Sequence, residues 1–389
     1  MKKKKYMLFT CTALMYMLSS CISEFEATGL KELGSILVVE GIILEEGTKI
    51  TLSRVVHLNE NTKNFLFENV NSATIHIIDE ANNVIAVVEQ TNNWGEYVVK
   101  EKISFVPGMK YALDIKVFLK HYQSAFVEPV NTPAIDSVSW KLNDDNSIDI
   151  MVSTHASDNK TLYCFWDFKE DWEIRSRYRT YLRYDPITQT VIPQSLTGDN
   201  RYYCWASDYS KSLLLGSSEK LTNAVIKDQK IHTLQPGDTR YSYLYSITVN
   251  QYVLEREASV YFNNLQRNIE DSGSLFAPQP SEMKGNIKCI SNPEEAVVGY
   301  IFASKPTSFR LYIPMAELNL NDFEDRARCE QTSDFRSLDE ALRFGYEIFS
   351  EINSGQYNYI TRSCVDCMAR GIMGNTQKAK PDFWPNEHR

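Results

Sequence analysis

A short stretch near the middle of the chain carries residue types that enzymes use for acid–base chemistry. Asp167, Glu170 and Asp171 lie between Trp166 and Trp172. Paired carboxylates beside aromatic surfaces are the arrangement with which glycosidases cleave sugars. The same pattern occurs in a charged strand whose tryptophans pack in the core, which is the commoner place for a large aromatic side chain. No second carboxylate cluster accompanies the stretch, so we expect no catalysis here and keep Trp166 and Trp172 as a candidate platform for a carbohydrate or peptide ligand.

The sequence lacks the common signatures of hydrolases, metalloproteases and nucleotide-binding enzymes. It contains no H-E-x-x-H, no G-x-S-x-G, no Walker loop and no G-x-G-x-x-G motif. No two histidines stand three or four residues apart, the spacing that would place two metal ligands on one helix face. The six are His57, His76, His121, His155, His232 and His388. We therefore expect no enzyme activity, no metal site and no cofactor.

The start of the chain is typical of a bacterial lipoprotein signal. Four lysines at 2–5 precede an apolar run at 6–18. This run is too short for a membrane-spanning helix, which takes about 20 apolar residues. It ends in Leu18-Ser19-Ser20-Cys21, which resembles a lipobox, the motif whose cysteine sulfur receives a diacylglycerol before the peptide is cut. An ordinary signal peptide with a coincidental cysteine is the alternative. We expect residues 1–20 to be the signal peptide and Cys21 to carry lipid.

The segment behind Cys21 is predicted to be a tether, residues 21–33. Each buried CH₂ group contributes about 0.8 kcal/mol, so two or more acyl chains would hold a protein stably on a membrane. Glu24 and Glu26 follow the cysteine closely. Short acidic stretches at this place act as surface-export signals in some bacteria, and a solvated tether is the alternative. We expect an outer-membrane anchor, with the chain exposed at the cell surface rather than facing the periplasm.

The other cysteines indicate structural disulfide bonds. Six remain after Cys11 and Cys21 are set aside: Cys164, Cys204, Cys289, Cys329, Cys364 and Cys367. An even number in an oxidising compartment permits up to three disulfides, and sequence alone does not fix their pairing. Free buried thiols, or metal or redox chemistry at the C-x-x-C of Cys364 and Cys367, are the alternatives. Zinc would need a second ligand pair at short spacing, which is missing. We favour Cys329 paired with Cys364 or Cys367, because these residues flank a predicted helix.

Most of the chain alternates between apolar and polar residues, as half-buried strands do. Residues 34–130 contain six or seven short runs of this kind with regular turn signals. This pattern predicts an immunoglobulin-like β-sandwich. Residues 131–389 are predicted to form a second β-rich domain with two helices and a cysteine-containing C-terminal loop.

The two helices are predicted from different signals. Near 253–271 an apolar stripe recurs at helical spacing, made of Leu254, Ala258, Tyr261, Leu265 and Ile269. This stripe is most simply explained by packing on a sheet. Near 338–351 the second helix begins at a capping box formed by Ser337 and Glu340.

Composition argues against nucleic acid as a partner. The net charge of the whole chain is −9, and loss of the four signal lysines makes it −13. Proteins that bind phosphate backbones need clustered Lys and Arg residues, so we expect no nucleic-acid binding. The hydrophobic content of 43% is ample for buried cores, and the length suggests two or three domains.

Several segments resemble one family of Bacteroidetes-type lipoproteins, grouped as domain of unknown function 4249. The similar pieces include LVVEGIILEEGTKITLSR, GEYVVKEKISFVPGMKYALDI, NNLQRNIEDSGSLFAPQPSEMKGNI and CVDCMARG, and the resemblance covers roughly residues 30–385. The family has no assigned activity, so the resemblance carries over no catalytic residue. It implies an outer-membrane lipoprotein, often associated with TonB-dependent receptors in nutrient uptake.

Three functions remain open at this point. The first is a non-catalytic accessory or binding component of a TonB-dependent uptake system, with the outer-membrane receptor as its partner. The second is a surface adhesion or envelope-structural lipoprotein without an uptake role. The third is an enzyme, which would require perturbed carboxylates in a cleft near residues 166–172. We expect the first.

Overall fold

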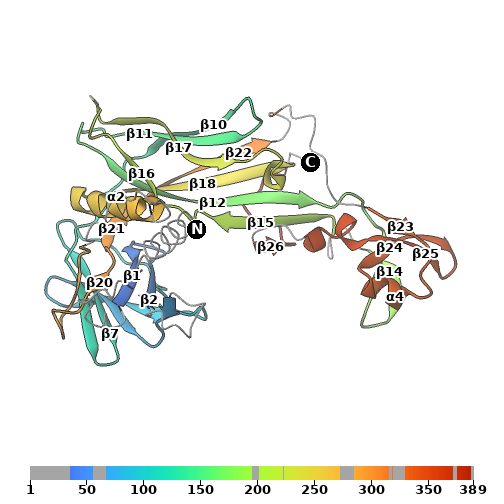
Figure 1. Cartoon of the computed structure of the whole chain (residues 1–389), viewed down its shortest axis with the longest axis horizontal. Helices are drawn as coiled ribbons and strands as arrows, with labels where there is room; N and C mark the ends of the chain where they lie inside the picture. Colours follow the sequence, from blue (N-terminus) through green and yellow to red (C-terminus); the bar gives the residue numbers. More distant parts are fainter. Residues whose placement is uncertain are drawn as a thin grey trace, which may run out of the picture.

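The computed structural model describes residues 36–55, 67–194, 201–221, 223–271, 284–314, 318, 329–370 and 375–386. The described chain is mainly β, as predicted. Figure 1 shows three parts along the molecule: an N-terminal sandwich at one end, a central sandwich, and a small lobe at the opposite end. We call this small lobe, formed by residues 178–194 and 329–370, the distal lobe.

The N-terminal sandwich is one sheet that curls so that its halves enclose a common core. Its strands follow the order β19-β8-β7-β4-β5-β6-β2-β1-β21-β9, with β3 on β2 and β20 on β1. The core is formed by aliphatic side chains from both halves, among them Leu37, Ile50, Ile75 and Leu113. The predicted N-terminal β-sandwich is therefore confirmed. Its strands are β1 (Ile36–Ile43), β2 (Lys49–Val55), β3 (Phe67–Asn69), β4 (Thr74–Asp79), β5 (Val84–Gln90), β6 (Glu96–Val98), β7 (Tyr111–Val117), β8 (Lys120–Ser124), β9 (Val130–Asn131), β19 (Ile287–Cys289), β20 (Val297–Val298) and β21 (Phe302–Lys305).

Three of these strands correct the predicted domain boundary at residue 130. β19, β20 and β21 come from a segment assigned to the second domain, yet they pair with β8 and β1 of the first. The Asn286 side chain holds this segment, residues 284–305, in place. Its Nδ2 donates to the Ile301 carbonyl at 2.7 Å, and its Oδ1 accepts from the Ile301 amide at 2.8 Å. The physical reason is that the outer side of β1 needs a hydrogen-bonding partner, which a distant segment supplies in parallel.

The central sandwich consists of two antiparallel sheets. One has the order β10-β11-β17, and the other has the order β22-β18-β12-β15-β26 with β16 also on β12. Trp166 and Trp172 of β12 share a core with Ile148 and Ile150 of β11. The strands are β10 (Ile135–Leu142), β11 (Ile148–His155), β12 (Tyr163–Arg175), β15 (Tyr203–Tyr209), β16 (Leu214–Ser217), β17 (Val225–Leu234), β18 (Leu244–Val253), β22 (Thr307–Pro314) and β26 (Asn375–Gln377), and a 3₁₀ turn, η1 (Thr239–Tyr241), precedes β18.

The distal lobe has a small apolar core of its own. Ala341, Ile348 and Tyr359 are buried there against side chains of the β13–β14 hairpin, including Leu182 and Tyr184. Its elements are β13 (Leu182–Asp185), β14 (Thr190–Pro193), β23 (Gln331–Thr332), α4 (Leu338–Arg343), β24 (Tyr346–Asn353), β25 (Gln356–Thr361), η2 (Arg362–Cys364) and η3 (Cys367–Arg370).

The first predicted helix forms, and the second is shorter than expected. α2 (Arg256–Asp271) begins two residues after Leu254, the first residue of the predicted apolar stripe, and the last residue of that stripe, Ile269, is 60% exposed. Ala258 and Phe262 pack between the two sandwiches against Phe302. α4 starts at the predicted cap, with the Ser337 hydroxyl accepting from the Glu340 amide at 3.2 Å. The predicted extension to residue 351 is wrong.

The early end of α4 has a local cause. Gly345 has a φ of +80°, which turns the chain out of the helix. The residues that follow form β24, in which Ile348 is buried opposite Tyr359 of β25. Strand pairing in the distal lobe therefore overrides the helical spacing of this short segment.

Two disulfide bonds hold the C-terminal part together. Cys329 pairs with Cys364, one of the two partners expected for it, with a Cα–Cα distance of 5.8 Å. Cys367 pairs with Cys204 of β15, a pairing that the sequence did not suggest, and so joins the distal lobe to the central sandwich. Cys164 and Cys289 are buried free thiols, and burial raises the pKa of Cys164 to about 12.

The proposed anchor lies outside the described residues, since these begin at Ile36, and Cys21 therefore has no structural description. Across the described ranges, no helix combines the length and the apolar character that crossing a bilayer requires.

The packing of residues 284–305 against β1 can be tested at Gly299. Its φ is +147°, and a Cβ there would lie 2.2 Å from the carbonyl oxygen of Val39 in β1. Gly299→Ala should lower the free energy of unfolding by about 2–4 kcal/mol, because β1 and this segment would be forced apart. Gly47→Ala is the control, since it has a φ of +79° but nothing within 4 Å. It should cost about 1 kcal/mol in urea unfolding. Equal losses of stability in the two variants would contradict the close approach of Gly299 to Val39.

Candidate functional site

The structure contradicts the proposed ligand platform. Trp166 and Trp172 are both 0% exposed, because the even-numbered residues of β12 face the core between the two central sheets. The indole nitrogen of Trp166 donates to the Gln251 side chain at 2.9 Å. Neither ring offers a face to a ligand, so the commoner role of core packing applies to both.

Glu170, on the same face of β12, belongs to a buried polar network. Arg240 donates to its Oε1, and the Tyr245 hydroxyl donates to its Oε2 at 2.8 Å. His232 Nε2 lies 3.5 Å from Oε2. Burial by itself raises the pKa of Glu170, but the His232 hydrogen bond, the Arg240 charge and the Tyr245 hydrogen bond outweigh it. The pKa is therefore below its ordinary value, and the side chain is an ionised structural group.

Asp171 and Glu173 point to the other face of the central sheet. Lys169 Nζ lies 2.9 Å from Asp171 Oδ1. Glu173 Oε1 accepts from Arg175 at 2.7 Å, and its Oε2 accepts from the indole of Trp384 at 3.1 Å. Both carboxylates are at most 2% exposed. Glu173 thereby fastens the C-terminal segment onto the sheet, whereas Asp171 pairs with Lys169 and lies 3.6 Å from Arg310 Nη1 of β22.

Asp167 is the remaining carboxylate of the stretch. It accepts hydrogen bonds from Asn250 at 2.6 Å and from the Tyr252 hydroxyl at 3.0 Å. Burial raises its pKa despite these donors. The four acidic residues of β12 are thus divided between two faces of one sheet, and the structure does not bring them together as a catalytic pair.

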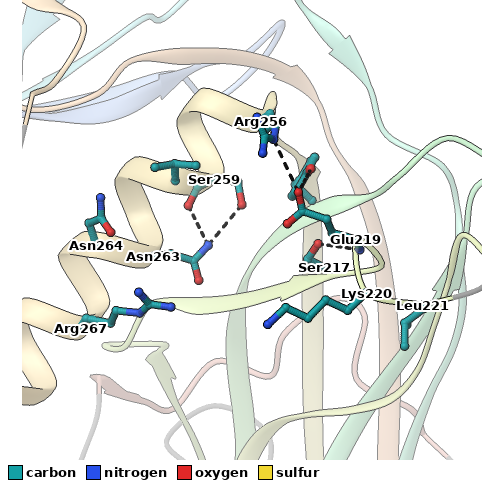
Figure 2. A pocket seen from close by; sticks show the side chains of 11 residues that line it. Ser217, Glu219, Lys220, Leu221, Arg256, Ser259, Asn263, Asn264 and Arg267 are labelled. Atoms are coloured by element: carbon teal, nitrogen blue, oxygen red, sulfur yellow. Dashed lines mark hydrogen bonds and ion pairs between the residues drawn. The ribbon is translucent and has the colours of Figure 1, made fainter.

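A pocket lies instead between α2 and the turn that follows β16, as Figure 2 shows. Its volume is about 400 Å³. The lining is formed by α2 on one side and by β12, the end of β16 and the following turn on the other. The lining residues are Tyr163, Ser217, Glu219, Lys220, Leu221, Arg256, Ser259, Val260, Asn263, Asn264 and Arg267.

One end of this α2 pocket is braced by Glu219. The Tyr163 hydroxyl donates to Glu219 Oε1 at 3.1 Å, and Arg256 Nε lies 3.5 Å from the same oxygen. The Glu219 amide donates to the Ser217 hydroxyl at 3.0 Å. These contacts join the start of α2 to β12 and β16, so the two walls of the pocket are held in a fixed relation at this end.

The other end of the α2 pocket is positively charged. Figure 2 shows Lys220 and Arg267 extending toward each other from opposite walls. Within the described ranges, neither side chain forms an ion pair with a carboxylate. Asn263 extends from the α2 wall, and its Nδ2 donates to the Ser259 carbonyl at 2.7 Å. The arrangement can hold an anion.

The sequence did not predict this site, because the apolar stripe of α2 marks only the face of the helix that packs against the protein. Ser259, Asn263 and Arg267 recur every four residues on a different face of the same helix. That polar stripe was a usable signal for one wall. The opposite wall, Ser217 to Leu221, could not be paired with it before the fold was known.

The fold and the pocket define a mainly β protein with a polar pocket between α2 and the turn after β16. No group of three or more His, Cys, Asp or Glu side chains suited to a metal ion occurs in the part of the chain that the structure describes. The chain belongs to the family described as Domain of unknown function (DUF4249), whose model matches residues 22–310. No curated protein matches the chain. The family match includes the whole α2 pocket and ends before residues 329–370 of the distal lobe.

The structural role of Glu170 predicts a pH-dependent loss of stability. Glu170→Gln should lower the free energy of unfolding at pH 7 by about 1.5–3 kcal/mol, because the Tyr245 hydroxyl would lose its charged acceptor and Arg240 would keep only Asp238 of its two carboxylate partners. The folded-state pKa of Glu170 is depressed, so its contribution is complete above the ordinary glutamate pKa of about 4.3 and is lost as the pH falls through the folded value.

Urea unfolding between pH 7 and pH 3 measures this difference. The gap between wild type and Glu170→Gln should shrink below about pH 4.3. Glu80→Gln, at an exposed turn position, is the control and should leave stability unchanged. A gap that stays constant over the whole pH range would contradict the ionised buried network.

Proposed function

We propose that this chain is a lipid-anchored outer-membrane protein and a non-catalytic accessory or binding component of a TonB-dependent nutrient-uptake system. The lipobox-like sequence ending at Cys21 and the family membership support an anchored, exported protein. The acidic residues Glu24 and Glu26 support exposure at the cell surface. The partner is a TonB-dependent receptor in the same membrane.

The proposal that the chain is non-catalytic rests on the hydrogen-bond partners of the acidic residues in β12. An enzyme built on residues 166–172 would need them in a cleft, and none of these residues lines the described pocket. Glu170 and Glu173 are instead hydrogen-bonded to the protein's own cations and rings. Reorganising such a network for catalysis would separate buried charges from their partners, which costs several kcal/mol.

The exposed apolar side chains of the distal lobe are the main support for a protein partner. The large exposed apolar side chains of this lobe include Tyr181, Ile187, Phe344 and Ile352, which are exposed by 68%, 90%, 69% and 54%. Apolar side chains exposed on a protruding part commonly mark interaction surfaces. The lobe is also held rigid by the Cys329–Cys364 disulfide and by Arg201, whose Nη1 lies 3.2 Å from Glu347 Oε2. A pre-ordered surface loses little entropy on binding.

The position of the distal lobe suits a partner that stands in the same membrane. It lies at the opposite end of the molecule from the N-terminal sandwich, where the described chain begins (Figure 1). The 15 positions from Cys21 to Ile36 span at most about 50 Å when fully extended. An anchored chain would therefore search a confined volume, in which its effective concentration near a receptor is high.

Affinity capture from gently solubilised native membranes tests the proposal. The wild-type chain should bring down an outer-membrane β-barrel receptor in near-stoichiometric amount. A distal-lobe variant, Ile187→Ser with Phe344→Ser, should lose most of that receptor. The matched control, Val84→Ser with Val87→Ser, changes two valines of the N-terminal sandwich that are 54% and 52% exposed, and should retain it.

Two results would overturn the proposal. Capture of the chain alone, even after cross-linking, would favour a surface adhesion or envelope-structural lipoprotein. Equal receptor recovery with both double variants would show that the distal lobe is not the docking surface. Membrane fractionation of Cys21→Ala provides an independent check on the anchor, since this variant should leave the membrane fraction.

A further inference from the structure

The charged end of the α2 pocket has an electrostatic feature that calls for a ligand. Lys220 and Arg267 point toward each other across the hollow, and no described carboxylate neutralises either one. Like charges that face each other raise the energy of the empty site, and an anion between them would be attracted to both. The whole chain is acidic, with a net charge of −9, so a local excess of cations is a specific feature of this surface.

The single carboxylate in the lining does not cancel this charge. Glu219 is held at the opposite end of the pocket by Tyr163 and Arg256. Three cationic side chains and one carboxylate therefore line the pocket, and the two cations at one end have no carboxylate partner among the described residues. This polarity would orient a ligand that carries its charge at one end only.

The rest of the lining is suited to hydroxyl groups rather than to apolar surface. Asn263, Asn264, Ser217 and Ser259 supply neutral donors and acceptors. Val260 and Leu221 are the aliphatic members, and both side chains are largely exposed to solvent. A volume of about 400 Å³ is within the range of small-molecule sites and holds one or two sugar rings rather than a long apolar chain.

From these features we infer that the α2 pocket binds an acidic sugar, with the carboxylate between Lys220 and Arg267 and the ring hydroxyls on Asn263, Asn264 and Ser217. The inference rests on the proposed function only in treating this sugar as the nutrient to be captured. Binding itself requires the α2 pocket alone and is independent of the distal lobe and of any receptor.

Isothermal titration calorimetry on the purified full chain in detergent tests this assignment. The probes are galacturonate, glucuronate, galactose and inorganic phosphate. A uronate should bind about tenfold or more tightly than galactose, because the neutral sugar lacks the charge-assisted contacts. Added salt should weaken uronate binding, since the two cations are exposed to solvent.

Variants locate the binding in the α2 pocket. Lys220→Gln and Arg267→Gln should each reduce uronate affinity about tenfold, the loss expected for one charge-assisted contact. Lys141→Gln is the matched control, because it removes the same charge from an exposed position on β10, outside the lining. Asn263→Ala should weaken the uronate and leave phosphate binding unchanged, since phosphate does not need the hydroxyl contacts.

Several outcomes would overturn the inference. Galactose binding as tightly as a uronate, uronate binding unaffected by both cation variants, or no binding of any probe would each do so. Phosphate binding as tightly as a uronate would show a general anion site instead of an acidic-sugar site. Receptor capture with Lys220→Gln and Arg267→Gln should remain at the wild-type level, so failure here is distinct from failure of the receptor proposal.

Discussion

The structure depends most on the burial of three carboxylates in one strand. Glu170, Asp171 and Glu173 of β12 are each at most 2% exposed, and a buried carboxylate costs several kcal/mol unless partners compensate for it. The partners come from three different segments. Arg240 of η1 and Tyr245 of β18 bind Glu170, and Trp384 of the C-terminal segment binds Glu173. The buried carboxylates of β12 need these hydrogen-bond and ion-pair partners. This requirement fixes how the central sheets, the η1 turn and the end of the chain are arranged.

The same constraint separates stability from ligand binding. A carboxylate that must hold a buried arginine cannot also move protons for a substrate without destabilising the fold. Groups that remain available to a ligand lie at the margin of the central sandwich, where α2 crosses over to the N-terminal sandwich. Aromatic packing of Phe165 and Phe262 against Phe302 holds that junction, with ring centroids 5.9–6.4 Å apart. The α2 pocket is therefore built on a rigid contact between two parts of the molecule.

Local patterns in the sequence predicted local structure well. The apolar stripe from Leu254 marked α2, and Ser337 with Glu340 marked the start of α4. Alternation predicted the N-terminal sandwich because those strands bury one face. It did not orient Trp172, because β12 buries residues of both faces between Glu170 and Ile174 and the alternating signal disappears there. Trp166 lies before this region, where the strand still alternates and Trp166 is on its buried side.

Long-range pairing could not be predicted from local patterns. One partner of β1 is β21, some 260 residues later, and the partner of Cys367 is Cys204, at a separation of 163 residues. Both contacts depend on how whole sheets pack against each other. A short segment of sequence contains no information about such packing. The α2 pocket depends on the same kind of contact. Its helical wall was visible as a polar stripe, but Lys220 became relevant only when the turn after β16 was placed beside Arg267.

The central claim is that an anchored chain meets a receptor through its distal lobe. In-cell photocross-linking tests it most directly, with a photoreactive amino acid placed at Ile187, and at Val84 for comparison, in otherwise unchanged chains. The account predicts a covalent product between position 187 and an outer-membrane β-barrel receptor, and little or none from position 84. Cross-links to the receptor from position 84 but not from position 187, or from neither, would contradict it.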